Sequence, residues 1–328
     1  MKIGVVGCGA LGSYYGGLLC KAGHETHFLL RSDYDTVRKQ GVSIESPNGA
    51  FHFQPHAHDD PSAIGECDLV VIGLKTTANH AFSHLLPPLV GSNTTLLTLQ
   101  NGLGNEEALE ALFPDNTILG GLCFVCLNRI EPGRIRHMDH GLIMMGAHQD
   151  TSSARALECV EVFDQAGIPC RYTDHLAKAH WEKLMWNVPF NGLGVAGSLG
   201  HDGFIVASSR LGSLPSSDCM DANALLGDAE WEARVRGLMR EVASVANELG
   251  LSVDTDLESK LIARTRTMGP YKASTLIDYE RGDPLEMNSL FLEPLKQAKE
   301  AGIETPLLER LTLILAELQG RQDRSAQT

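Results

Sequence analysis

The fold of this chain is decided by the stretch Lys2-Ile3-Gly4-Val5-Val6-Gly7-Cys8-Gly9-Ala10-Leu11-Gly12. An apolar run that predicts a buried strand ends in the spacing G-x-G-x-x-G, and helical periodicity follows over residues 10–22. In this motif the first glycine makes a tight turn, the second lets a pyrophosphate approach the backbone, and the third permits close packing of helix on strand. The pattern predicts a dinucleotide site formed by Gly7, Cys8, Gly9, Ala10, Leu11 and Gly12. A purely structural glycine turn is the alternative.

Strand and helix patterns alternate from this motif outward to about residue 173. Residues 24–30 predict a second strand, which completes a β-α-β unit within about 30 residues and indicates a parallel sheet. Residues 153–166 predict a helix. Residues 134–137 and 142–145 are expected to pair as a hairpin around Asp139-His140-Gly141. Further buried strands are expected at residues 69–74, 95–99, 118–125 and 169–172.

Helical periodicity replaces this alternation after residue 173. Helices are expected at residues 174–196, 229–249, 255–267, 286–301 and 306–319. A Gly- and Ser-rich stretch, 197–227, predicts a long irregular connection, and the polar residues 320–328 predict a frayed end. The fold class is therefore α/β: a Rossmann-type dinucleotide-binding domain over 1–173, followed by an all-helical substrate and catalytic domain over 174–328. The active site is expected in the cleft between them.

Charge and composition argue against some classes of binding partner. The 328 residues carry a net charge of −14 without a Lys/Arg block, which argues against nucleic acid and anionic membrane. No apolar run approaches the roughly 20 residues that span a bilayer, and the first residues lack the apolar core of a signal peptide. The eight cysteines are scattered, so reduced thiols and a cytoplasmic location are expected.

Two groups of residues imitate metal sites. Cys123 and Cys126 are closely spaced, but they lie in an apolar run that predicts a buried strand. His52, His56 and His58 follow the turn signal Pro47-Asn48-Gly49, so they are expected on the solvent side of a β-hairpin. No metal site is predicted.

The end of the second predicted strand indicates which nicotinamide cofactor is used. NAD sites usually carry an acidic residue here that binds the ribose 2′-hydroxyl, whereas this chain has Arg31 followed by Ser32. An arginine can hold a 2′-phosphate through two parallel hydrogen bonds, so NADP(H) is predicted. Asp33 is expected to lie beyond the strand. Lys75 and Asn101 each follow a predicted strand and are expected to line the cofactor site.

A polar stripe marks the first helix of the second domain. Lys183, Asn187 and Asn191 stand four residues apart, so they share one helix face. A cation and two neutral amides suit a small oxygen-rich anion. A solvated helix face with an ordinary lysine is the alternative when the stripe is considered alone.

Together these features resemble the ketopantoate reductase (2-dehydropantoate 2-reductase) family. The resemblance rests on the glycine motif, Arg31-Ser32, Leu74-Lys75, Gln100-Asn101-Gly102, the Lys183 stripe and the run from Ser274 to Glu286, in the family's order. It implies NADPH-dependent reduction of ketopantoate to pantoate, on the route to pantothenate and coenzyme A. It also implies that Lys183 and Glu286 are catalytic. Contacts to substrate or nicotinamide ribose are implied for Asn101, Lys183, Asn187, Asn191, Ser274 and Glu286.

The chemistry of a ketone reduction agrees with a lysine acid. Hydride addition develops negative charge on the carbonyl oxygen, and an ammonium group stabilises that charge and supplies the proton. Free lysine has a pKa of about 10.4, so it is protonated at neutral pH and still far more acidic than an alkoxide. The amides of Asn187 and Asn191 can bind the acid without competing for the proton.

Several alternatives stay open. Asp283-Pro284-Leu285-Glu286 also has the pattern of a helix cap, which would make Glu286 structural. Tyr271 stands where the family commonly has asparagine, so a second hypothesis is an NADPH-dependent reductase of another branched or aromatic 2-keto acid. A third is a non-catalytic NADP-binding sensor. The sequence leaves the oligomeric state open, with a homodimer as the assembly to test.

Overall fold

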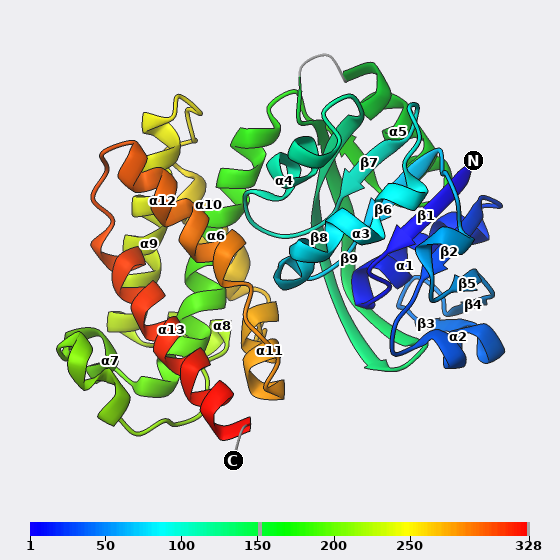
Figure 1. Cartoon of the computed structure of the whole chain (residues 1–328). Coiled ribbons are helices and arrows are strands. Elements are labelled where there is room, and N and C mark those ends of the chain that lie inside the picture. The colour runs from blue at the N-terminus through cyan, green and yellow to red at the C-terminus, as the bar shows by residue number, and fades with distance from the viewer. Residues whose placement is uncertain (150–152, 327–328) are drawn as a thin grey trace. The chain divides into compact units, whose positions relative to one another are not determined.

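The computed structural model describes residues 1–149 and 153–326 and divides into two compact units, Met1–Ala179 and His180–Thr328. The division falls inside helix α6 (Leu176–Ala196), whereas the sequence placed the domain boundary ahead of this helix, at residues 173 and 174. The first unit is α/β and the second helical, so the predicted fold class is confirmed (Figure 1).

A single mixed sheet forms the first unit. Its strands follow the order β4-β3-β9-β8-β7-β6-β1-β2-β5, with β10 also paired to β9. Neighbours are parallel from β8 through β5, and β8 and β9 are antiparallel. The strands are β1 (Lys2–Val6), β2 (Glu25–Leu29), β3 (Val42–Glu45), β4 (Phe51–Phe53), β5 (His56–His58), β6 (Leu69–Ile72), β7 (Thr95–Thr98), β8 (Thr117–Glu131), β9 (Arg134–Ala147) and β10 (Cys170–Tyr172).

The sheet is rolled. Strands β4 and β5 stand at opposite ends of the strand order, but only Gln54 and Pro55 separate them in the chain. Three Cα steps span at most about 11 Å, so the two ends of the sheet must approach each other. Helix α1 (Ala10–Lys21) packs against β1, β2, β3, β4, β8 and β9, inside this roll. The Tyr15 hydroxyl, fully buried, donates a 3.2 Å hydrogen bond to the carbonyl of Gly141 on β9.

The remaining helices cover the sheet. Helix α5 (Ser153–Gln165) adds Phe163 to the core around α1. Phe82 and Leu109 lie in a second core, formed with the other face of β1, β6 and β7. The helices that contribute to this core or connect the strands are α2 (Tyr34–Gln40), α3 (Phe82–Leu85), α4 (Asn105–Leu112) and the 3-10 turns Pro61–Ala63, Thr76–Ala81 and Pro87–Leu89.

The predicted hairpin around residues 139–141 is wrong. Residues 134–147 form one strand, β9, and its hairpin partner is β8, which is much longer than predicted. The turn lies at residues 132–133, where Gly133 has a φ of 72°. Val125 pairs with His140 and Phe124 with Leu142, so Gly141 is an extra residue in a β-bulge. Residues with positive φ suit turns and bulges alike, which explains the error.

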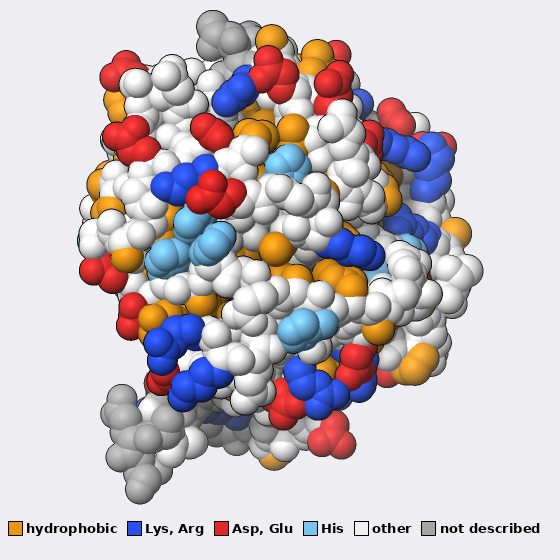
Figure 2. All heavy atoms as spheres, turned by 90° about the vertical axis from the view of Figure 1, so that its right-hand side faces the viewer, with side chains coloured by type: hydrophobic (Ala, Val, Ile, Leu, Met, Phe, Trp, Pro, Cys, Tyr) orange, Lys and Arg blue, Asp and Glu red, His pale blue; other side chains and the backbone are white. Residues whose placement is uncertain are grey.

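The predicted histidine hairpin is only partly right. His52 lies on β4, in an antiparallel hairpin with β3, as predicted. His56 and His58 lie on β5, which pairs in parallel with β2. The chain crosses from one end of the sheet to the other after Phe53, which the turn signal did not reveal. Figure 2 shows histidine side chains gathered on the side of this unit that carries β2.

Helix α6 is the centre of the second unit. From Leu184 to Ala196 nearly every side chain is buried, which is unusual for a single helix and requires neighbours on all sides. A Cβ at Gly192 would touch Leu311, and one at Gly194 would touch Leu276. The surrounding helices are α7 (Asp202–Ile205), α8 (Ala222–Gly227), α9 (Ala229–Glu248), α10 (Leu257–Arg266), α11 (Ser274–Arg281), the π turn Asn288–Leu292, α12 (Glu293–Glu300) and α13 (Pro306–Ala326).

Two predictions for this unit are wrong, and α13 explains both. Residues 320–326 continue the helix instead of fraying, because polar side chains among them bind the backbone of other segments: Gln322 donates to the carbonyl of Tyr279. The last two residues of the predicted frayed end, 327–328, lie outside the described residues. Residues 197–227 contain α7, α8 and the 3-10 turns Gly197–Leu199 and Ser208–Ser213. Arg310 donates to the carbonyls of Gly203 and Val206, and Arg321 to that of Leu214.

Neither metal ligation nor a membrane span is indicated by the described residues. Within residues 1–149 and 153–326, no three His, Cys, Asp or Glu side chains are grouped so that they could hold a metal ion. None of the helices in these ranges is both long and apolar enough to cross a bilayer. Cys123 and Cys126 are buried in β8, as predicted.

Candidate functional site

The three glycines of the opening motif have different surroundings. Gly7 has a φ of 91°, and a Cβ there would lie 2.3 Å from the amide nitrogen of Leu74. A Cβ at Gly12 would lie 2.3 Å from the carbonyl oxygen of Gly7, so the helix packs directly on the turn. A Cβ at Gly9, by contrast, would have no atom beyond its chain neighbours within 4 Å, and the φ of −72° there suits any residue. Packing therefore accounts for Gly7 and Gly12 but not for Gly9.

Two predicted cofactor residues lie at the carboxyl edge of the parallel strands. Lys75 follows β6 and is exposed at the start of the 3-10 turn Thr76–Ala81. Asn101 follows β7, immediately before Gly102, which has a φ of 84°. Because β1, β6 and β7 are parallel neighbours, their carboxyl ends and the glycine turn share one edge of the sheet.

A chain of amides that the sequence did not reveal supports Asn101. Gln100 donates to Asn79 at 2.7 Å, Asn79 donates to Asn105 at 2.9 Å, and Asn105 donates to the carbonyl of Asn101 at 3.2 Å. Gln100 and Asn105 are buried. Each bonded amide restricts the next, so the loop after β7 has one favoured conformation. No spacing in the sequence links Asn79 to Gln100 and Asn105.

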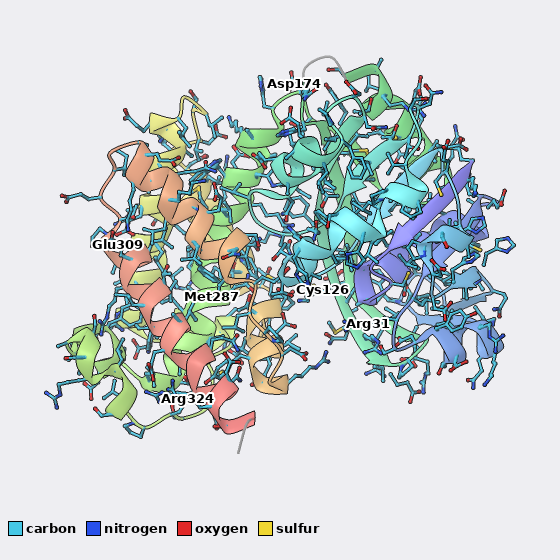
Figure 3. The ribbon with its side chains drawn as sticks, viewed as in Figure 1. Arg31, Cys126, Asp174, Met287, Glu309 and Arg324 are labelled. Carbon is cyan, nitrogen blue, oxygen red and sulfur yellow. The ribbon has the colours of Figure 1, made fainter. Side chains whose placement is uncertain are left out.

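Charged residues gather at the end of β2. Arg31 is exposed just beyond the strand, where the sequence predicted it (Figure 3). Asp33 is buried at the start of α2, and both of its carboxylate oxygens accept from the guanidinium of Arg129, one of them from Nε at 3.0 Å. The Ser32 hydroxyl donates to the same carboxylate at 2.9 Å. Sequence reasoning missed Arg129, which lies 96 residues away from Asp33.

The polar stripe lies on α6. Lys183 is half-buried, while Asn187 and Asn191 are 6% and 2% exposed. Solvation does not explain two buried amides, so the alternative of an ordinary wet helix face is wrong. The side-chain oxygen Oδ1 of Asn191 accepts a 2.9 Å hydrogen bond from the backbone N–H of Thr275 and a 3.2 Å bond from the Ser274 hydroxyl.

Asn191 therefore caps α11 from another helix. Helix α11 has no side-chain cap of its own, and its first N–H groups need acceptors. With its oxygen engaged at α11, the amide of Asn191 has one orientation, and its NH₂ group is directed away from α11. The structure thus brings together Asn191 and Ser274, which are 83 residues apart, although α11 itself was not predicted.

Aromatic side chains flank the stripe. Trp186 stacks on Phe190 with ring centroids 4.9 Å apart, and Tyr271 tilts against Trp186 at 6.0 Å. The indole N–H of Trp186 donates to the Thr265 hydroxyl at 2.9 Å, which holds the ring in place. Tyr271 thus belongs to a rigid aromatic cluster beside the helix that carries Lys183.

Glu286 does not occupy the third position of a helix capped by Asp283, which was its structural alternative. Residues 283–286 are not helical, and the next helix begins at Met287, so Glu286 is not the third residue of a capped helix. Its side chain is only 3% exposed. A buried carboxyl group immediately before a helix is compatible with the predicted site role of Glu286. The location of the active site between the two units stays a prediction.

Comparisons with known proteins agree with this class of structure. The family model "Ketopantoate reductase PanE/ApbA" matches residues 3–150, and its C-terminal counterpart matches residues 218–319. A 2-dehydropantoate 2-reductase from Nostoc sp. is 37% identical over 98% of this chain and 96% of its own length. The crystal structure of 2-dehydropantoate 2-reductase from Geobacter metallireducens is 40% identical with a TM-score of 0.87, covering 96% of this chain and 99% of that one.

A more distant structural neighbour shares the fold alone. D-mandelate dehydrogenase with NADH and anilino(oxo)acetate has a TM-score of 0.81 at 19% identity, covering 98% of this chain and 99% of its own. The family models and the two full-length relatives define the class of protein as an oxidoreductase that uses a nicotinamide cofactor. Within that class, the chain belongs to the ketopantoate reductase family.

Proposed function

We propose that this protein reduces 2-dehydropantoate to pantoate with NADPH, as its relatives' names indicate for them. Bound NADPH would supply the hydride for the ketone carbon, and the Lys183 ammonium group would donate a proton to the carbonyl oxygen, which gives the 2-hydroxy acid and NADP⁺. The observation that carries the proposal is the stripe on α6, where a lysine is aligned with two buried amides and one of them is oriented through α11.

Each residue of the stripe has a part in the proposal. The ammonium group of Lys183 stabilises the developing alkoxide and donates the proton. The NH₂ groups of Asn187 and Asn191 donate to the carboxylate or hydroxyl of the acid, and Ser274 and Glu286 complete the polar wall. Asn101 lies with Lys75 at the cofactor end.

Gly9 and Arg31 carry the cofactor part of the proposal. Because none of the described residues fills the space at Gly9, a pyrophosphate approaching the backbone explains why a glycine stands there. The neighbouring backbone of Cys8, Ala10 and Leu11 and the start of α1 supply N–H groups for the phosphates. Arg31 is exposed and holds the 2′-phosphate of NADP(H).

The test is Lys183→Ala. Turnover should fall by about 10²–10⁴ while NADPH still binds, because a proton donor is lost and the dinucleotide motif is untouched. Lys178→Ala, on the same helix, is the matched control and should keep full turnover. Unchanged turnover in Lys183→Ala would remove this residue from the mechanism. Binding of NADPH without reduction of any 2-keto acid by the wild type would favour a sensor.

The aromatic cluster supports a second candidate substrate class. Trp186 and Tyr271 are partly exposed and offer apolar ring surface to a larger, aromatic 2-keto acid, while the buried Phe190 supports Trp186 from behind. A panel of 2-keto acids with NADPH separates the two candidates. If an aromatic acid is reduced hundreds of times more efficiently than ketopantoate, the first substrate assignment is wrong. The predicted homodimer is tested separately by light scattering.

A further inference from the structure

An acidic residue stands where an NADP-binding protein should avoid one. NAD-binding Rossmann folds use a carboxylate near the end of the second strand to bind the ribose 2′-hydroxyl, and such a charge repels a 2′-phosphate. Asp33 lies four residues beyond the end of β2 and two residues beyond Arg31. Burial and the negative charge of Asp33 raise the pKa of the Cys8 thiol, so this carboxylate acts on the glycine turn itself.

The guanidinium group of Arg129, on strand β8, faces the carboxylate of Asp33. Arg129 binds both oxygens of Asp33, and Ser32 adds a third hydrogen bond. A carboxylate accepts about four hydrogen bonds in all, so little capacity is left for a ribose diol. Only 9% of the Asp33 side chain is exposed, compared with 38% of Arg129. The pair is therefore a shielded ion pair, in which each charge depends on the other.

The long β8–β9 hairpin delivers this arginine. Gly120 on β8 is the last residue opposite β7, and β8 continues through Glu131. Eleven further residues extend about 36 Å, past the carboxyl edge of the parallel strands. Figure 1 shows β8 and β9 running together beyond their neighbours toward β3 and α2, and β9 pairs there with β3. The extension of β8 thus brings Arg129 to Asp33, in addition to closing the rolled sheet.

We propose that Arg129 determines the preference for a 2′-phosphorylated dinucleotide by neutralising Asp33. The inference deepens the proposed function and rests on its use of NADPH at Arg31. Arg129 is a positioning residue: it cancels the carboxylate that would repel the 2′-phosphate and withdraws that carboxylate from the ribose. Arg31 then supplies the positive charge that binds the 2′-phosphate.

The magnitude follows from Coulomb's law. At a separation of about 6 Å in water, an unpaired carboxylate and a phosphate dianion repel each other enough to weaken binding about tenfold. Arg129→Gln should therefore lower the ratio of kcat/KM for NADPH to that for NADH about tenfold at low ionic strength. The loss should shrink as salt is added, because the screening length falls.

Reversal of the loss is the decisive part of the test. Asp33→Asn in the Arg129→Gln background removes the unpaired charge and should restore the wild-type ratio. Arg136→Gln is the matched control, because Arg136 lies on the same hairpin and pairs with the exposed Glu45. It should leave the ratio unchanged. Dissociation constants for NADP⁺ and NAD⁺ give the same comparison without turnover.

The outcomes separate this inference from the proposed function. Wild-type protein that binds NAD⁺ as well as NADP⁺ would overturn the NADPH assignment. A wild type that prefers NADP⁺ and an Arg129→Gln variant with the same preference would overturn the inference alone, as would a double variant no better than the single one. If Arg129→Gln does not fold, the uncharged pair of the double variant still tests the idea, since it should retain the wild-type preference.

Discussion

The different surroundings of Gly9 and Gly12 lead to a prediction that separates ligand binding from folding. Within residues 1–149 and 153–326, a methyl group at Gly9 meets no atom within 4 Å beyond its chain neighbours, and the extended backbone there suits alanine. Gly9→Ala should change the free energy of unfolding by less than about 0.5 kcal/mol, because the entropy gained against the unfolded chain offsets a slightly poorer helix cap. The same methyl group occupies the space needed by a pyrophosphate, so NADPH should bind about tenfold to a hundredfold more weakly.

Gly12→Ala should lower the stability of the fold first, and affect NADPH binding only as a consequence. Its methyl carbon would lie 2.3 Å from the Gly7 carbonyl oxygen, about 1 Å inside an ordinary carbon–oxygen contact. The neighbour is backbone of the turn, which cannot rotate away, so we expect a loss of about 1–3 kcal/mol in stability. Any loss of NADPH affinity should accompany that change.

Calorimetric titration with NADPH and thermal unfolding measure both effects. Gly227→Ala is the matched control, because Gly227 also has open space around it and lies in the second unit. It should leave NADPH binding unchanged and raise the stability by no more than about 1 kcal/mol, because Gly227 is the last residue of α8. A Gly9→Ala variant that binds NADPH as tightly as the wild type would refute the reasoning, since the space at Gly9 would then have no connection with the cofactor.

Three further predictions concern single contacts. Asn191→Ala should cost about 1–3 kcal/mol of stability, because the N–H of Thr275 loses its acceptor, whereas Asn191→Asp should keep the stability and raise KM by adding negative charge; equal melting temperatures for both would contradict this. Asp228→Ala should cost about 1 kcal/mol in urea unfolding by removing the cap of α9, and Asp256→Ala, which makes no capping bond, should cost less. Burial, and then the charge of neighbouring histidines, lowers the pKa of His58 below its usual value of 6.5, so the unfolded chain takes up the proton first. Stability should be full above about pH 7 and decline as the pH falls through 6.5, and His58→Gln should flatten that decline; an unchanged pH profile of unfolding would disprove the assignment.

Features that depend on short-range spacing were predicted well. The strand, turn and helix of residues 2–21 follow from a few neighbouring residues, and the α6 stripe follows from helix geometry alone. Errors occurred where one local signal suits two structures. Asp139-His140-Gly141 can form a turn or a bulge, and only pairing with β8 selects the bulge.

The sequence by itself determined the class of fold, the dinucleotide motif and the identity of the polar residues on α6, because each rests on periodicity or spacing within single helices, strands and turns. Tertiary structure alone decided the rolled sheet, the capping of α11 by Asn191 and the pairing of Asp33 with Arg129. These contacts join residues 83 and 96 positions apart, and no periodicity along the chain encodes them. The physical reason is that a buried carboxylate or N–H group requires a partner but does not specify where in the chain that partner lies.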